Sequence, residues 1–419
     1  PHVTREQSSG PHSTSYEPWF IAAIVVGAFV RLFFVFATQG TLDVDSWLVH
    51  TLALEKQGLI SYYEGGPLIF NHPPPAALLV STLGKLATAT GASFAALLRL
   101  PFAVIDLATT AMIVLLLGRT KRAHQVAALY WLHPLSIIFS AYHGNTDTAI
   151  AFFLVTTTWF VSRNKALLAG FALGACLWIK IPGVLMAPAF LFALPTLRAR
   201  AEFCAGAGAI ALLGYGPALW MNADAVITAV FLYPGLNIHT SSGIASWGLR
   251  NIYPAVFTVP EAIRMTYVEV LQFTINHNTL MCVTPMVAFA WLRRNARDVS
   301  GIATTVSGSY AIFYGITNFW AFQYFAWVIP FWLMSTRWFA VTASLLATAY
   351  IYGAYAWMCG DLLLMGPWDF IGKPDWPFWL IGARNTANLF FLGAGLYFIG
   401  KAVHEEVASR RAPSIATKS

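Results

Sequence analysis

The chain has 419 residues, of which 58% are hydrophobic and only 10% are charged, and its mean hydropathy is +0.62. A water-soluble globular protein of this length does not need so much apolar sequence, so the composition excludes that class. The net charge of +7 comes mostly from basic residues in short connections, which indicates membrane topology and no nucleic-acid partner. The four cysteines are scattered without CxxC spacing, so we expect no disulfide framework, no metal site and no cofactor.

Apolar segments follow one another along the chain, enough for about a dozen spans of about 20 residues each. They predict an all-α, polytopic transmembrane bundle of about twelve spans, with one continuous membrane domain over 19–400. Residues 1–18 and 401–419 are interpreted as cytoplasmic tails, the first of them disordered. Two long external loops are expected, at 39–99 and 222–278. The expected spans are 19–38, 100–118, 126–141, 149–161, 166–179, 183–194, 203–221, 279–292, 302–319, 322–334, 338–357 and 377–399.

Basic residues cluster in every second connection and in the C-terminal tail. The positive-inside rule places these connections, and both termini, in the cytoplasm. This fit requires that 76–89 does not span, so we expect it to be an interfacial helix, as is 46–59, which Gly58 should end. Arg31 lies within the first span and needs a partner inside the bundle. Lys180 and Arg250 are lone basic residues on the opposite, outer face, where the rule expects few, so they also need partners.

Two acids, Asp43 and Asp45, stand where the chain leaves the first span. An acid at the mouth of a span costs energy to desolvate, which favours a functional site over wet loop acids that cap the next helix. Asp147, beside His143 and Asn145, follows a later span on the same predicted side. His143 is as well explained as a hydrogen-bonded interfacial histidine.

Aromatic residues on the outer face have two explanations. Trp247 could stack on a sugar ring, or it could belong to the belt of aromatic residues at the membrane interface. Both readings stay open from the sequence.

Several short motifs resemble those of integral-membrane glycosyltransferases of the GT-C fold that use polyprenyl- or dolichyl-phosphate sugars. Members carry an Asp in the first external loop, then an aromatic residue and a Gly, and Asp43, Trp47 and Gly58 are similar in spacing. Members also carry an Asp or Asn and an aromatic residue before Pro-Pro. Asn71-His72-Pro73-Pro74 is similar to that motif, with His72 in place of Tyr.

Two further motifs extend the resemblance through the first 190 residues. His143-Gly144-Asn145-Thr146-Asp147 is similar to a Trp-Gly-Gln-x-Asp motif, and Lys180-Ile181-Pro182 to a Lys-x-Pro motif. Where members often show a His-Glu-Lys-like stretch, this chain has Phe322-Gln323-Tyr324. Their order, and their common predicted side, make the combination more specific than any one motif.

The resemblance implies an inverting transferase that moves a mannose or glucose from a polyprenyl-phosphate donor to an acceptor hydroxyl. The acceptor would be a glycan, glycolipid or protein, and membrane lipids would surround the enzyme. It implies a multi-pass protein of a bacterial or archaeal plasma membrane, or of the endoplasmic reticulum, with its site on the outer or lumenal face. The candidate donor- and acceptor-binding residues are Asp45, His72, His143, Asn145, Asp147, Trp247 and Gln323. Lys180 and Arg250, the lone basic residues of the outer face, are the candidate phosphate ligands.

Asp43 is the predicted general base. It has the better spacing to Trp47 and Gly58, and burial near the span should raise its pKa. Asp45 is better explained as a cap or an acceptor ligand, because Ser46 is expected to begin the interfacial helix.

Two rival functions remain. A transporter or flippase would explain charge within the membrane and the proline-broken stretch at Lys180. Against it, the chain has no internal repeat, and its polar residues fall in external loops. An oligosaccharyl or protein glycosyltransferase with a diphosphate donor usually needs a metal and a large soluble domain, for which the sequence gives no sign.

Overall fold

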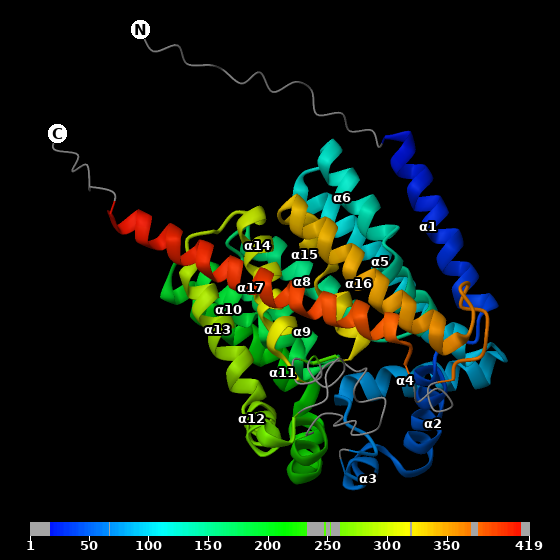
Figure 1. The fold of residues 1–419 in the computed structure, drawn as a ribbon. Helices are drawn as coiled ribbons and strands as arrows, with labels where there is room; N and C mark the ends of the chain where they lie inside the picture. The colour runs from blue at the N-terminus through cyan, green and yellow to red at the C-terminus, as the bar shows by residue number, and fades with distance from the viewer. Residues whose placement is uncertain are drawn as a thin grey trace.

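The computed structural model describes residues 17–66, 68–232, 247–248, 252, 260–318, 321–369 and 376–411. Every regular element within these ranges is a helix, and most of the helices run side by side (Figure 1). This confirms the predicted all-α class. Arg250, residues 1–16 of the first expected tail and residues 412–419 of the second lie outside the described residues.

The helices follow one another with short connections. In chain order they are α1 (Pro18–Ala37), α2 (Leu42–Gln57), α3 (Leu59–Glu64), α4 (Pro74–Thr90), α5 (Phe94–Leu117), α6 (Lys121–Trp131), α7 (Pro134–Ile137), the π-helix η1 (Ile138–His143), α8 (Asp147–Val161), α9 (Ala166–Cys176), the 3-10 helix η2 (Ile181–Met186), α10 (Ala187–Ala193), α11 (Leu197–Val226), the π-helix η3 (Ile227–Phe231), the 3-10 helix η6 (Glu261–Ile263), α12 (Arg264–Asn276), α13 (Asn278–Leu292), α14 (Val299–Ile316), the 3-10 helix η7 (Phe322–Trp327), α15 (Ile329–Met334), α16 (Arg337–Cys359) and α17 (Phe378–Arg411).

Five helices of the described chain are long and apolar enough to cross a membrane: α1, α5, α11 with η3, α16 and α17. Four shorter apolar helices accompany them: α8, α9, η2 with α10, and α13. The twelve expected spans are therefore not twelve long helices. Proline divides several of them, because it lacks an N–H and favours a helix start. Pro134 splits the expected span 126–141 into α6, α7 and η1, and Pro330 stands at the start of α15, which follows η7 within the expected span 322–334.

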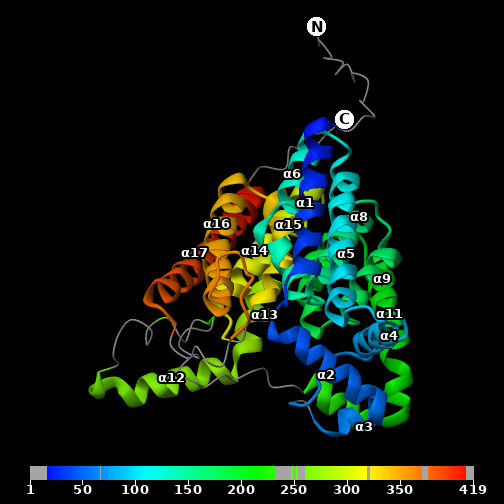
Figure 2. The same cartoon turned by 90° about the vertical axis from the view of Figure 1, so that its right-hand side faces the viewer.

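Helices α2, α3 and α4 lie at the end of the bundle opposite to the start of α1, and α2 and α4 run across the bundle axis (Figure 2). The two helices that we expected in this loop are both present. Gly58 ends α2 with φ 78°, a conformation that favours glycine. Between α2 and α4 the chain forms the short helix α3, whose Tyr62 and Tyr63 are buried. That this loop faces outwards stays a prediction.

Arg31 has the partner that its place in the first span requires. Its Nη2 atom lies 2.9 Å from Oδ2 of Asp106 on α5, and the two side chains are 1% and 0% exposed. The remaining capacity of Asp106 is used by Ser136, which donates to Oδ2 at 2.8 Å, and by Tyr130, which donates to Oδ1 at 2.6 Å. Arg31 also donates to the carbonyl oxygen of Trp131 at 2.6 Å. This cluster joins α1, α5, α6 and α7.

Close packing fixes α9 against α11. A Cβ atom on Gly170 would lie 2.1 Å from the carbonyl oxygen of Phe203, and one on Gly206 would lie 2.4 Å from that of Leu167. Only glycine allows the two backbones to approach this closely. The packing positions the end of α9, where Lys180 follows.

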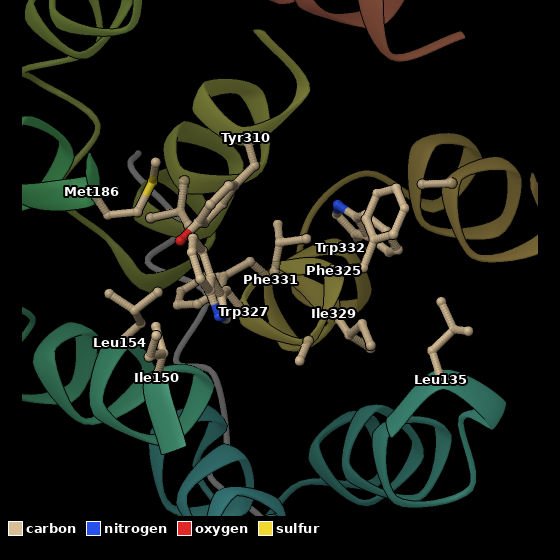
Figure 3. Close-up of a cluster of buried hydrophobic side chains, with 14 of the residues drawn as sticks. Leu135, Ile150, Leu154, Met186, Tyr310, Phe325, Trp327, Ile329, Phe331 and Trp332 are labelled. Carbon is tan, nitrogen blue, oxygen red and sulfur yellow. The ribbon is translucent and has the colours of Figure 1, made fainter. Parts of the chain in front are cut away.

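The centre of the bundle is an aromatic core around η7 and α15 (Figure 3). Trp327 points into the space between Tyr310 of α14 and the aliphatic side chains of Ile150 and Leu154 on α8 (Figure 3). The rings of Tyr310 and Trp327 have centroids 6.2 Å apart. This core holds η7 against the first turns of α8.

At the other end of the bundle, α17 continues past residue 400, where we expected the membrane domain to end, to Arg411. Arg293 and Arg294, after α13, form ion pairs with Glu405 and Glu406 at 3.1 and 2.9 Å. The described part of the expected tail is therefore helical and attached to the bundle. The 222–278 loop is also partly helical, since it contains η3 and α12.

Candidate active site

The first turn of α2 carries both candidate acids. The helix begins at Leu42, with Thr41 at the N-cap, and not at Ser46 as we expected. Asp43 and Asp45 therefore lie in its first turn, where negative charge stabilises a helix N-terminus. Val44 and Trp47 face the interior, whereas Asp45 is exposed and has no side-chain hydrogen bond to a described residue. The prediction that Asp45 caps the helix is wrong.

Asp43 faces the bundle and meets the loop before α8. Its Oδ2 atom lies 2.7 Å from Nε2 of His143 and 3.3 Å from the amide nitrogen Nδ2 of Asn145. An ionised carboxylate only accepts, so His143 and Asn145 are the donors. Within the described chain no donor contacts Oδ1, and 45% of the side chain is exposed. One carboxylate oxygen is therefore held by the protein and the other is open.

His143 has its second ring nitrogen occupied as well. Nδ1 forms a short hydrogen bond with the hydroxyl group of Tyr355, which lies near the end of α16 and is completely buried. The chain of contacts thus runs from Tyr355 through His143 to Asp43. These three residues come from α16, η1 and α2.

The local backbone explains how His143 reaches Asp43. It is the last residue of η1, and wide π-helical turns of this kind occur often at functional sites. Gly144 then reverses the chain with φ 67°, and a Cβ atom there would lie 2.5 Å from Cγ of Arg99. Both the conformation and the space require glycine.

Asn145 is oriented by the start of α8. Its Oδ1 atom accepts from the backbone N–H of Asp147 at 3.2 Å and from the hydroxyl of Thr146 at 3.3 Å. These bonds settle which end of the amide is the acceptor, so Nδ2 points to Asp43. The amide is a second fixed donor for Oδ2.

Asp147 and Lys180 form a buried ion pair beside this group. Nζ of Lys180 lies 2.6 Å from Oδ2 of Asp147, with the two side chains 14% and 0% exposed. The indole N–H of Trp327 donates to Oδ1 of Asp147 at 2.6 Å. Both oxygens of Asp147 are thus used by the protein, and Lys180 has the partner that its predicted place on the outer face required.

Lys180 keeps donor capacity. Its ammonium group has three N–H donors, and Asp147 is the one described acceptor that it contacts. Nζ also lies 5.4 Å from the ring centroid of Tyr324, a distance at which a cation is attracted to the ring. The group can therefore donate to an anionic ligand without leaving Asp147.

The electrostatics favour an ionised Asp43. Burial raises the pKa of Asp43, but the charge and hydrogen bond of His143 and the charges of Lys180 and His72 together lower it to about 2. Our expectation that the pKa of Asp43 is raised was wrong, because these neighbours outweigh burial. His72 has its pKa lowered to about 3, by burial and by the charge of Lys180, so the ring is neutral at physiological pH.

His72 lies among aromatic rings under α2. Its ring centroid is 4.3 Å from that of Trp47 and 5.4 Å from that of Phe70. The hydroxyl of Tyr63 donates to its carbonyl oxygen at 2.7 Å. The motif around Pro73 and Pro74 thus places His72 close enough to Asp43 for their charges to interact.

The other predicted residues are not part of this group. Trp247 is 1% exposed, and its ring packs against those of Phe325, Tyr350 and Phe391. This core position gives no support to a sugar-stacking role. Gln323 lies half-buried in η7 with no described hydrogen bond. Within the described residues no three His, Cys, Asp or Glu side chains group as metal ligands.

Sequence reasoning missed Tyr355 and the role of Trp327 as a donor to Asp147. Tyr355 lies in an unbroken apolar helix with no motif around it. Trp327 stands in a stretch rich in aromatic residues, and nothing in the sequence distinguishes it from the others. A sequence motif associated with the site would have been needed to predict either contact, and no such motif is present at Tyr355 or at Trp327.

Comparison with known proteins gives one clear result. No curated protein and no solved structure matches the chain. The family model of glycosyltransferase family 87 matches residues 70–316, more than half of the chain. The matched segment includes His72, His143, Asn145, Asp147 and Lys180, and leaves out Asp43 and Tyr355. This family consists of membrane-embedded, GT-C-type glycosyltransferases that use polyprenyl-linked sugars. The chain belongs to glycosyltransferase family 87.

Proposed function

We propose that this glycosyltransferase moves a hexose, mannose or glucose, from a polyprenyl-phosphate donor to a hydroxyl group of a glycan, glycolipid or protein. Asp43 is the general base, and the reaction inverts the anomeric carbon. The site faces the outer or lumenal side of the membrane. The observation that carries this proposal is the carboxylate of Asp43, with one oxygen fixed and the other open.

The open oxygen suits a base. The acceptor hydroxyl attacks the anomeric carbon, and its proton passes to Oδ1 of Asp43 as the new C–O bond forms. Oδ2 stays hydrogen-bonded to His143 and Asn145, so the carboxyl group keeps its orientation during the transfer. A pKa of about 2 keeps Asp43 ionised at any physiological pH, so the base is always available.

Lys180 suits the leaving group. As the bond between the anomeric carbon and the phosphate oxygen breaks, the electron pair stays on the lipid phosphate, which gains negative charge. Free N–H donors of Lys180 can stabilise this charge. Asp147 holds Lys180 with both oxygens engaged, so we assign it to positioning Lys180 and no longer to binding the acceptor. Arg250 stays a predicted second phosphate ligand.

We propose that His72, which lies close enough to Asp43 for their charges to interact and packs on the ring of Trp47, contacts the sugar. Direct attack on the face opposite to the phosphate inverts the anomeric centre, since no covalent sugar–enzyme bond is needed. Asp45 and Gln323 remain candidates for acceptor contacts.

The test is a donor panel. The purified, reconstituted chain is incubated with polyprenyl-phosphate mannose, polyprenyl-phosphate glucose, and the corresponding diphosphates, together with a lipid acceptor extract. We expect transfer from one monophosphate donor, with the product of opposite anomeric configuration by NMR. Transfer from a diphosphate alone, or retention of configuration, contradicts the proposal. Movement of intact donor across vesicles without transfer supports the transporter alternative, which family membership does not favour.

A further inference from the structure

We propose that Tyr355 is a positioning residue for glycosyl transfer, whose hydroxyl group fixes His143 so that Nε2–H points to Asp43 and leaves Oδ1 open for the acceptor. This inference rests on the proposed role of Asp43. Tyr355 lies beyond residue 316, outside the segment that the family model matches. The C-terminal part of the chain would thus complete the site.

The hydrogen bonds decide the tautomer. Asp43 can only accept when ionised, so Nε2 of His143 must carry a proton. In the neutral imidazole Nδ1 is then an acceptor, and the Tyr355 hydroxyl donates to it. If His143 is protonated, the same hydroxyl accepts from Nδ1–H. Tyr355 therefore holds the ring in either protonation state, and in both of them Nε2 remains a donor to Asp43.

Packing fixes the hydroxyl. The ring of Tyr355 meets that of Trp368 edge to face, with centroids 5.0 Å apart and an interplanar angle of 70°. One helical turn further on, Cys359 lies 2.7 Å from the hydroxyl of Tyr142. Two positions four residues apart on α16 thus contact two consecutive residues of η1. The packing on Trp368 restrains the Tyr355 ring, and the Tyr142–Cys359 contact is a separate link between η1 and α16.

Other charged side chains also act on the carboxylate of Asp43, so a test of Tyr355 must leave those side chains unchanged. Lys180 and His72 act on Asp43, Asp43 in turn acts on His50, and Tyr355 is influenced by Tyr142, Asp147 and Cys359. A change confined to the Tyr355 hydroxyl leaves all of these side chains in place. Tyr355→Phe makes this change, because it removes one oxygen and keeps the ring.

Tyr142→Phe is the matched control. It also removes one buried hydroxyl next to η1 and α16, but the lost bond goes to Cys359 and not to His143. We expect Tyr355→Phe to lower kcat roughly tenfold, a part of the total effect of a general base, with a donor KM within about twofold of the wild type. An acid limb, absent from the wild type between about pH 5 and 8, should appear in this variant, because His143 is no longer held in place as the donor that keeps Asp43 ionised. Tyr142→Phe should keep the wild-type kcat and profile.

A double-mutant cycle separates positioning from general destabilisation. In a His143→Gln background Tyr355 has no imidazole to orient, so Tyr355→Phe should change kcat by less than about twofold. An equal loss in both backgrounds, or equal behaviour of Tyr355→Phe and Tyr142→Phe, overturns the inference. Tyr355→Phe removes the same hydroxyl in both backgrounds. If it acts only by reducing the amount of folded protein, the loss of activity will therefore be equal in both, which overturns the inference.

The role of Asp43 is tested apart from that of Tyr355. If Asp43→Asn is inactive and Tyr355→Phe behaves as wild type, only the role of Tyr355 fails. If Asp43→Asn is active, the proposed base itself fails.

Discussion

Two clusters of charged side chains, one around Arg31 of α1 and one around Asp43 of α2, differ in one respect. In the first, both oxygens of Asp106 and both terminal nitrogens of the Arg31 guanidinium are engaged by protein groups, and the side chains are at most 1% exposed. In the second, Asp43 has two donors on one oxygen and none described on the other, and 45% of it is exposed. Both clusters contain a charged group that burial alone would penalise.

The difference separates a structural ion pair from a reaction site. A closed cluster holds helices together, and nothing can be added to it without breaking a bond. An open one keeps an acceptor atom in place that only a ligand can use. The Asp147–Lys180 pair lies between these cases, since its carboxylate is closed and its ammonium group is open.

The largest effect is expected from breaking the closed cluster. Asp106→Leu leaves Arg31 buried without its carboxylate, which should cost roughly 3–5 kcal/mol in the free energy of unfolding. Thermal unfolding of the purified protein measures it, and activity per folded molecule should not change. The double variant Arg31→Met/Asp106→Leu should be more stable than the single one. A stable Asp106→Leu protein contradicts the structural role.

The next largest effect is expected at the open oxygen. Asp43→Asn keeps the shape and removes the base, so kcat should fall by roughly a hundredfold or more, while the donor still binds. Asp45→Asn is the matched control on the same helical turn, and it should retain measurable activity. An inactive Asp45 variant together with an active Asp43 variant would show that the base is Asp45.

In the Asp147–Lys180 pair, Lys180→Gln removes the positive charge that we propose for binding the donor phosphate. We expect the donor KM to rise by about tenfold, as for the loss of one charge-assisted hydrogen bond. Asp147→Asn should act in the same direction, because it releases Lys180. Lys165→Gln, at the exposed turn before α9, is the control. Unchanged donor kinetics in the Lys180 variant would place the phosphate elsewhere.

The pH profile sharpens the comparison further. Asp43 is active when ionised, and its pKa of about 2 means that this form is lost only as pH falls through about 2. The wild-type kcat should therefore have no acid limb from Asp43 between about pH 5 and 8. His143→Gln removes the charge and leaves burial, which raises the pKa, so an acid limb should appear at higher pH. An identical profile in both proteins contradicts this assignment.

The smallest effect is expected at Trp247. Trp247→Phe removes the hydrogen bond from the indole N–H to the carbonyl oxygen of Tyr314, 2.8 Å long, and should cost about 1 kcal/mol of stability. Donor and acceptor KM should not change. A rise in either KM without a loss of stability would restore the sugar-stacking role that the sequence suggested.

Much of the fold follows from the sequence. Apolar composition predicts the all-α class, Gly58 and the prolines predict helix ends, and Arg31 in an apolar span predicts a buried partner. The sequence does not predict which residue that partner is, because Asp106 lies in another apolar span and no motif around it indicates a contact with Arg31. Helix length was misjudged, since we expected the span 126–141 to be one helix across Pro134, where the structure breaks it.

The site follows from the sequence only in part. Asp43, His143 and Lys180 stand in short motifs with recognisable order, and the structure places them together. Tyr355 and Trp327 contact them from distant segments where no local pattern distinguishes them from core residues. The pKa of Asp43 was misjudged for the same reason, because a pKa depends on charges that are close in space and remote in sequence.

The shortness of α9 has a consequence for the lipid donor. Its 11 residues rise only about 16 Å, roughly half of the thickness of a hydrocarbon core. Glycine contacts with α11 keep α9 from sliding, so the position of Lys180, which follows its end, is fixed relative to α11. Under the proposed role of Lys180, the length of α9 would therefore set one fixed point in the bundle at which a donor phosphate is bound, and the acceptor would have to reach that point.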